Sequence, residues 1–150
     1  MKNWMEEALN MAKRAYKKNE VPIGAVIVKD GKIISKAYNQ REKKQNAIKH
    51  AEIIAIDKAC KKLKSWRLDG CTLFVTLEPC PMCSGAICNA RIDKVVYASS
   101  EKTSQDNLCE MILQSNRLNH KVLLEQDKNF EREASNLLTS FFKEKRQIKK

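Results

Sequence analysis

Glycine, proline and histidine are scarce in this 150-residue chain, with four, three and two copies. So few glycines and prolines, without any internal repeat, exclude a flexible linker or a low-complexity chain. Long apolar runs are missing too, and none approaches the ~20 residues of a membrane-spanning helix. The first 18 residues carry acids and lysines throughout, so they lack the apolar stretch of a secretory signal. We therefore expect one cytoplasmic domain over residues 1–150, with no membrane partner.

Two features of the composition bear on chemistry and partners. The six cysteines would suggest disulfides in a secreted protein, but without an export signal we expect reduced thiols, four of them small buried apolar residues. The net charge of +11, from 29 basic and 18 acidic residues, favours a polyanionic partner such as nucleic acid. The alternative is a generally lysine-rich composition without a specific partner.

The spacing of apolar residues divides the chain into alternating helices and strands. Helices are expected at residues 3–18, 50–63, 81–90 and 106–114, with a last helix capped by Asn129 and ending near residue 147, and strands at 24–29, 32–38, 72–77, 93–99 and 120–126. Asp30-Gly31 predicts a hairpin turn between the first two strands. The almost wholly apolar run 72–77 is typical of a central strand covered on both faces. This order predicts a three-layer α-β-α fold with a mixed five-stranded sheet.

Two short segments together contain the ligands of a metal site. His50 opens one predicted helix, and Cys80 and Cys83 flank the start of another at Pro81. One imidazole and two thiolates suit zinc, and the Cys-x-x-Cys spacing lets two sulfurs bind one ion from a single turn. Because both helices adjoin sheet strands, their starts can meet at one edge of the sheet. Three protein ligands leave the fourth tetrahedral position to water, as in catalytic zinc sites.

Glu52, two residues after His50, favours a catalytic site over a structural one. A carboxylate that is not needed as a ligand can shuttle protons to and from zinc-activated water. The pattern H-x-E followed by P-C-x-x-C is shared by the zinc nucleobase deaminases, adenine-deaminating enzymes among them. The residues alone leave three alternatives open: a redox Cys-x-x-Cys pair, a closed structural zinc site completed by another cysteine or His120, and a zinc-stabilised RNA-binding module without catalysis.

The chain resembles the cytidine deaminase superfamily and, within it, the bacterial tRNA-specific adenosine deaminases. The similarity extends over nearly the whole chain. The matching segments are EVPIGAVIV (20–28), YN (38–39), HAEI (50–53), TLEPCPMCSGAI (76–87), ARIDKVVYA (90–98), RLNHKV (117–122) and FFKEKR (141–146). Residues 99–108, SSEKTSQDNL, depart from the family because they lack its usual glycines.

The resemblance implies a cytidine deaminase-like fold and a zinc-dependent hydrolase that deaminates adenosine to inosine at the wobble position, A34, of tRNA. His50, Cys80 and Cys83 would hold one zinc ion per subunit. Glu52 would protonate N1 of a flipped-out adenine and then the leaving amine. The alternative is a deaminase of a free nucleobase or nucleoside such as guanine, cytosine or cytidine.

The resemblance also implies a substrate pocket and a partner subunit. Asn39 and the backbone amide of Ala51 would hydrogen-bond the base, and Val21 and Pro22 would line its pocket. The family is homodimeric, so we expect a homodimer that binds the tRNA anticodon stem-loop.

The end of the last predicted helix combines aromatic and basic residues. Phe142, Lys145 and Arg146 suit stacking on a base and neutralising phosphates, so we assign them to RNA binding. Phe141 shares a helical stripe with Leu137 and Leu138, which predicts a role in the core instead.

Overall fold

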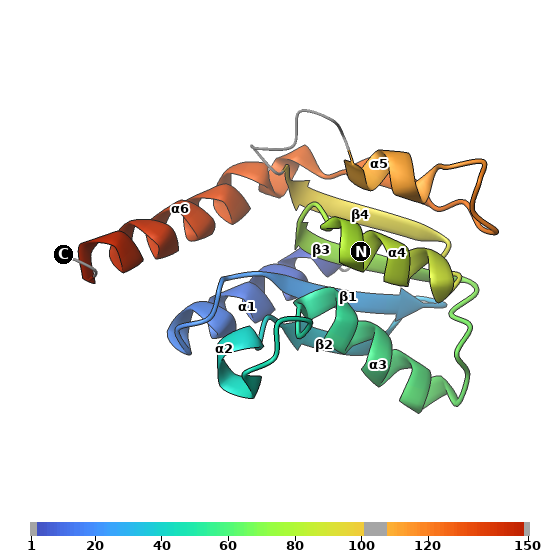
Figure 1. Ribbon diagram of the computed structural model, residues 1–150, viewed down its shortest axis with the longest axis horizontal. Coiled ribbons are helices and arrows are strands. Elements are labelled where there is room, and N and C mark those ends of the chain that lie inside the picture. Colours follow the sequence, from blue (N-terminus) through green and yellow to red (C-terminus); the bar gives the residue numbers. More distant parts are fainter. Residues whose placement is uncertain (1–2, 101–107, 149–150) are drawn as a thin grey trace.

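A computed structural model describes residues 3–100 and 108–148, and within them the strands form one mixed sheet (Figure 1). The strands are β1 (Gly24–Lys29), β2 (Lys32–Tyr38), β3 (Cys71–Leu77), β4 (Lys94–Ser99) and β5 (Leu123–Gln126), in the spatial order β2-β1-β3-β4-β5. β1 is antiparallel to β2 and to β3, whereas β3, β4 and β5 are parallel to one another. The predicted mixed five-stranded sheet is confirmed.

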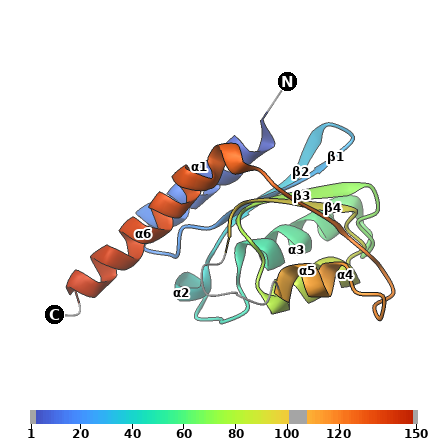
Figure 2. The ribbon, with the colours of Figure 1, turned by 90° about the horizontal axis from the view of Figure 1, so that it is seen from above.

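Helices cover both faces of the sheet, which confirms the three-layer prediction (Figure 2). One layer contains α1 (Trp4–Lys17) and α6 (Glu131–Ile148), and the other contains α3 (Ala51–Leu63), α4 (Pro81–Asn89) and α5 (Leu108–Leu113). A four-residue helix, α2 (Arg41–Lys44), and a 3-10 turn, η1 (Lys128–Phe130), were not predicted. Both are too short to leave a periodic apolar signal.

The central position of β3 follows from its two apolar faces. Leu73 and Val75 join the core beneath α3 and α4, whereas Phe74 packs against the core beneath α1. The neighbouring strand β1 behaves in the same way, because Val26 and Ile27 are both fully buried on opposite faces. A strand buried on both faces has no polar alternation, as the sequence of β3 predicted.

Gly24 lets α1 lie close to the first strand. A Cβ atom at this position would stand 2.0 Å from the carbonyl oxygen of Ala8 and 2.6 Å from the backbone nitrogen of Ala12. A side chain would therefore push the helix away from β1. α1 therefore packs closely on the sheet. The helix α6 belongs to the same layer, because it contacts both α1 and β4.

Two predicted boundaries were wrong. Asn129 does not cap the last helix: the side chain of Asp127 accepts a hydrogen bond from the backbone nitrogen of Asn129 at 3.1 Å, and a 3-10 turn precedes α6. The last strand begins at Leu123 rather than at residue 120, because the backbone N–H of Val122 donates to Leu113 instead of to β4.

Other expectations concern the surface and the cysteines. Within the described ranges, no helix has the length and apolar character needed to cross a membrane. All six cysteines lie in described parts of the chain and are free thiols, and Cys71, Cys88 and Cys109 are buried. Residues 101–107, in the segment that lacks the family's glycines, lie outside the described residues.

Candidate active site

The three candidate metal ligands all lie at helix starts on the same face of the sheet. His50 is the N-cap of α3 and Cys80 is the N-cap of α4, where Pro81 occupies the first turn. Proline suits this position because its missing N–H would have no acceptor there. β3 leads directly into α4, and α3 begins beside it, so both helix starts meet at one sheet edge (Figure 1).

The geometry of this cluster fits a zinc ion. The Nδ1 atom of His50 lies 3.6 Å from the Sγ atom of Cys80 and 3.6 Å from that of Cys83. Tetrahedral coordination with Zn–S of ~2.3 Å and Zn–N of ~2.0–2.1 Å places a nitrogen and a sulfur ligand about 3.6 Å apart. The three ligand atoms all lie within 4.8 Å of one another.

The described residues offer this cluster no fourth His, Cys, Asp or Glu atom. Cys88 directs its thiol to the carbonyl of Ile112 at 3.8 Å, inside the core. His120 has its Nε2 atom 2.7 Å from the carbonyl oxygen of Ile92, as expected of a packed structural histidine. A three-ligand group leaves one tetrahedral position for water, which is the arrangement of a catalytic zinc site.

The two cysteines of the cluster have opposite pKa shifts. The hydrogen bond from the Cys83 thiol, followed by the contact with His50, lowers the pKa of Cys80 to about 4. The Cys80 sulfur in turn raises the pKa of Cys83, and burial raises it further. Cys80 also accepts a hydrogen bond from the backbone nitrogen of Cys83 at 3.5 Å, at the positive end of α4. A thiolate is therefore favoured at the first cysteine, and the thiolate is the form that binds metal.

Glu52 lies in the first turn of α3 and is buried, with 4% of its surface exposed. Burial raises the pKa of its carboxyl to about 7, and the nearby Cys80 raises it as well, against the lowering effects of a backbone hydrogen bond and of His50. A carboxyl group with a pKa near neutrality can both accept and release a proton, which a shuttle requires. The metal-ligand candidates and Glu52 thus occupy one small region at the start of two helices.

Asn39 and Val21 line a cavity of about 340 Å³. The Oδ1 atom of Asn39 is buried and, among the described residues, is the buried side-chain polar atom that lacks a hydrogen-bond partner. An unpartnered buried acceptor costs free energy unless a ligand satisfies it, so this atom points to a bound donor group. Pro22 is buried beside Val21 but does not line the cavity, and Ala51 is fully buried in the first turn of α3.

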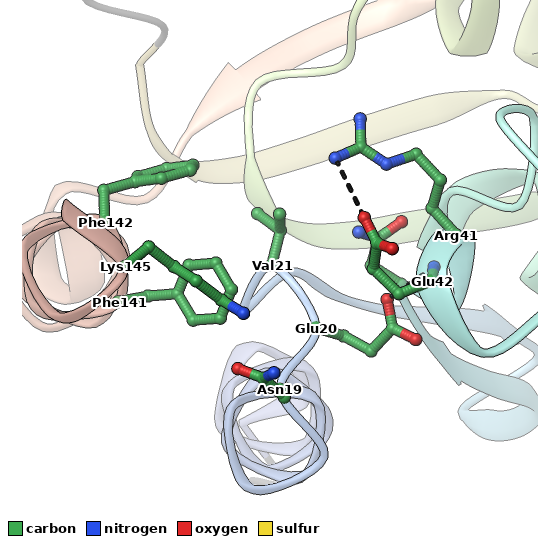
Figure 3. Close-up of a pocket in the computed structure, with 9 residues that line it drawn as sticks. Asn19, Glu20, Val21, Arg41, Glu42, Phe141, Phe142 and Lys145 are labelled. Atoms are coloured by element: carbon green, nitrogen blue, oxygen red, sulfur yellow. Dashed lines mark hydrogen bonds and ion pairs between the residues drawn. The ribbon is translucent and has the colours of Figure 1, made fainter. Parts of the chain in front are cut away.

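The far wall of the cavity comes from the last helix. Figure 3 shows Phe141, Phe142 and Lys145 reaching toward Val21 from α6, with Arg41 and Glu42 on the opposite side. Phe142 is 47% exposed, whereas Phe141 is 5% exposed and packs edge-on against Tyr16 at 5.9 Å between ring centroids. The predicted burial of Phe141 is confirmed.

The structure separates some of the predicted RNA-binding residues. Lys145 lines the cavity together with Phe142, but Arg146 is exposed and lies outside the lining. The three metal-ligand candidates do not line this cavity either. Val21 and Asn39 therefore belong to the wall of the cavity, whereas the His-Cys-Cys cluster lies outside this lining, at the starts of α3 and α4.

Sequence reasoning missed Glu20 and Arg41, both of which line the cavity. Glu20 is 1% exposed and accepts hydrogen bonds from the backbone nitrogens of Glu42 and Lys43 at 3.0 and 2.7 Å. The available signal was its place in the segment EVPIGAVIV, where a charged residue stands just before the turn that leads into a buried strand.

Known proteins similar to this chain are deaminases. The model of the MafB19-like deaminase family matches residues 1–146. A tRNA-specific adenosine deaminase of Bacillus subtilis (strain 168) is 47% identical over 148 residues, which are 98% of this chain and 91% of that protein.

Two solved structures are also similar. One, from a study of A-to-I editing by tRNA:A34 deaminases, has a TM-score of 0.82 at 35% identity and covers 89% of this chain and 97% of its own. A guanine deaminase from Bacillus subtilis has a TM-score of 0.63 at 41% identity, over 67% of this chain and 66% of its own.

A three-layer fold with a His-Cys-Cys cluster beside a buried glutamate defines the class of nucleobase deaminases. With residues 1–146 matched and 47% identity over nearly its full length, the chain belongs to the MafB19-like deaminase family, in the group of the tRNA-specific adenosine deaminases.

Proposed function

We propose that this protein is a zinc-dependent hydrolase that converts adenosine to inosine at the wobble position, A34, of tRNA. The observation that carries the proposal is the placement of buried Glu52 at the start of α3, two residues after His50 in the His-Cys-Cys cluster. The similarity to a tRNA-specific adenosine deaminase and to a structure from work on tRNA:A34 deaminases supports the choice of substrate.

His50, Cys80 and Cys83 would hold the metal, because their spacing matches tetrahedral zinc. Zinc, when bound, supplies an activated water at neutral pH for the hydrolysis. Glu52 would take a proton from the water and deliver it to N1 of adenine, and then move a second proton to the departing amino group. Water and adenosine enter, and inosine and ammonia leave, so the reaction needs no other reactant.

The base would be oriented by Asn39 and the first turn of α3. The unpartnered Oδ1 atom of Asn39 is an acceptor that an N–H group of a purine can satisfy. The backbone N–H of Ala51 is in the first helical turn, where no intrahelical acceptor exists, so it is available to an acceptor on the base. Val21 would form the apolar side of the pocket, supported by the buried Pro22 that follows it in the chain.

The RNA around the base would contact α6 and its neighbours. The half-exposed ring of Phe142 offers a stacking surface at the cavity, and Lys145 and Arg146 offer positive charge to phosphates. The net charge of +11 favours such a polyanionic substrate over a small neutral base.

The remaining proposals concern assembly and location. A homodimer is supported by exposed apolar side chains on α4 and α5, two helices that pack against each other. Met82 on α4 is 37% exposed, and Leu108 and Met111 on α5 are 42% and 61% exposed. We place residues 1–150 in one deaminase domain, which the family match to residues 1–146 supports. A cytoplasmic location is supported by six free thiols.

The proposal is tested by mixing zinc-replete protein with an A34 anticodon stem-loop and measuring inosine by mass spectrometry of digested nucleosides. A stem-loop with guanosine at position 34 is the matched substrate control, and Glu52→Ala is the protein control. Inosine at position 34 from the unaltered protein, lost in the variant, would support the assignment.

Two results would contradict it. Folded, zinc-replete protein that forms no inosine would exclude this substrate while leaving the metal site intact. Deamination of free guanine or cytidine without activity on the stem-loop would identify a free-base or nucleoside deaminase instead.

A further inference from the structure

The segment that joins Asn39 to His50 has little to hold it in place. All residues from 41 to 48 are exposed, so no buried apolar side chain anchors them. Several backbone hydrogen bonds shape the segment internally, among them those from the N–H of Gln40 to the carbonyl of Lys49 at 3.0 Å and from the N–H of Asn46 to the carbonyl of Arg41 at 3.1 Å. These bonds close the loop on itself but do not attach its tip, which contains α2, to the rest of the molecule.

The carboxylate of Glu20 makes that attachment. One oxygen accepts from the backbone nitrogen of Glu42 at 3.0 Å, and the other accepts from that of Lys43 at 2.7 Å. The side chain is 1% exposed, and no lysine or arginine in the described part of the chain forms an ion pair with it. A buried carboxylate without a cation depends on strong hydrogen bonds to its oxygens, and backbone N–H groups supply them here.

Glu20 is itself held firmly. Its backbone N–H donates to the carbonyl of Ala15 at 2.9 Å, so the residue continues from the end of α1, whose last two turns bury Met11, Ala12 and Ala15. The two N–H groups that it binds belong to the first turn of α2, where no intrahelical acceptor is available. The contact therefore joins a rigid element to an otherwise exposed one.

The two elements joined by Glu20 form different walls of the cavity. Asn19 and Val21 lie on one side of it and Arg41 and Glu42 on another, and Figure 3 shows Glu20 between them. Arg41 is held only loosely by its own side chain, in a 3.7 Å ion pair with the exposed Glu42. The position of its backbone thus depends on the turn that Glu20 fixes.

We infer that Glu20 is a positioning residue for the substrate: its buried carboxylate fixes the turn of residues 41–44, and this turn places Arg41 at the cavity, with Lys43 and Lys44 next to it in the turn, toward the phosphates of the RNA. The inference rests on the proposed function for its substrate, because Arg41, Lys43 and Lys44 suit a polyanion. The carboxylate acts through the backbone of the turn and does not touch the reacting atoms.

Hydrogen exchange of individual amides, followed by NMR, tests the structural half without any substrate. Glu20→Gln keeps the side chain's shape but replaces one acceptor oxygen by a donor, so the amides of Glu42 and Lys43 should exchange roughly 10-fold faster or more. Glu6→Gln, which neutralises an exposed glutamate of α1, should leave both rates unchanged. Unchanged exchange in Glu20→Gln would overturn the inference. If that variant does not fold, Glu20→Asp, which withdraws the carboxylate by one methylene, supplies the same measurement.

Kinetics with the A34 stem-loop test the functional half. Glu20→Gln should raise KM roughly 10-fold, which corresponds to one charge-assisted hydrogen bond, and leave kcat within about 2-fold with zinc content unchanged. A fall in kcat or in bound zinc at unchanged KM would overturn the positioning role, because it would indicate a general loss of structure. If the unaltered protein forms no inosine, the proposed function fails, whereas the exchange rates still decide whether Glu20 holds the turn.

Discussion

The metal-ligand cluster and the wall of the cavity are built in opposite ways. Two short sequence motifs place His50, Cys80 and Cys83 at adjacent helix starts on a buried sheet. The cavity wall instead combines the end of α1, the turn of α2 and the end of α6, and it mixes buried side chains such as Phe141 with exposed ones such as Arg41 and Phe142. The cluster is thus specified by local motifs, whereas the cavity wall depends on how distant elements pack.

The contacts that anchor α6 to α1 show how distant elements form the cavity wall. The hydroxyl of Tyr16 donates to Glu144 at 2.5 Å across 128 positions of sequence, and its ring packs against Phe141. These contacts bring Phe142 and Lys145 to the cavity. Changes at the cluster should therefore affect metal binding and catalysis, and changes at the wall should affect affinity for RNA.

The largest effect is expected from Cys83→Ala. Removing one of three ligands should reduce bound zinc from about one ion per chain to near zero and abolish inosine formation, because an open site with two protein ligands is weak. Metal content is measured by elemental mass spectrometry after gel filtration. Cys88→Ala, a buried thiol outside the cluster, is the matched control and should keep its zinc. Full zinc occupancy in Cys83→Ala would refute the ligand assignment.

Glu52→Gln should separate catalysis from metal binding. The amide has nearly the same shape but cannot carry a proton between water and base, so kcat should fall roughly 10²–10⁴-fold. Zinc content should stay at one ion per chain, because Glu52 is not a ligand. Single-turnover inosine formation gives the rate, and a variant that loses zinc as well as activity would show that the residue has a structural role at the cluster.

The adjacent phenylalanines should respond in opposite ways. Phe141→Ala should lower the free energy of unfolding by ~3–5 kcal/mol, because it empties a buried site. Phe142→Ala should leave stability nearly unchanged and weaken stem-loop binding by ~1–3 kcal/mol, the usual worth of one stacked base. Denaturant unfolding and fluorescence anisotropy measure the two quantities. Equal RNA affinity in Phe142→Ala and the unaltered protein would remove this residue from the interface.

The smallest effect should distinguish Lys145 from Arg146. If each contacts one phosphate, its replacement by alanine should reduce the slope of log K against log[salt] by roughly 0.7, the value for one phosphate contact on a single strand. Lys145 lines the cavity and Arg146 does not, so Lys145→Ala should have the greater effect on affinity at a fixed salt concentration. Titrations at several salt concentrations give both values, and a larger loss from Arg146→Ala would place the RNA path outside the cavity.

Much of the fold was predictable because its elements have strong local signals. The D-G turn and the alternation around it predicted β1 and β2 with their observed bounds, and the apolar run of β3 predicted its central place. The misses lie where local signals are weak or compete. Asp127 rather than Asn129 caps the 3-10 turn before α6, and α2 is a single turn whose first N–H groups donate to the side chain of Glu20, outside the local sequence.

The sequence by itself determined the catalytic chemistry of this protein, since the ligand types, the spacing of Cys80 and Cys83 and the glutamate after His50 are local properties. Only the tertiary structure decided which side chains surround the cavity. It left Oδ1 of Asn39 buried without a partner, moved Phe141 into the core and Phe142 to the cavity, and placed Glu20 beneath the turn of α2. These outcomes depend on burial and on contacts between segments distant along the chain, which no local pattern specifies.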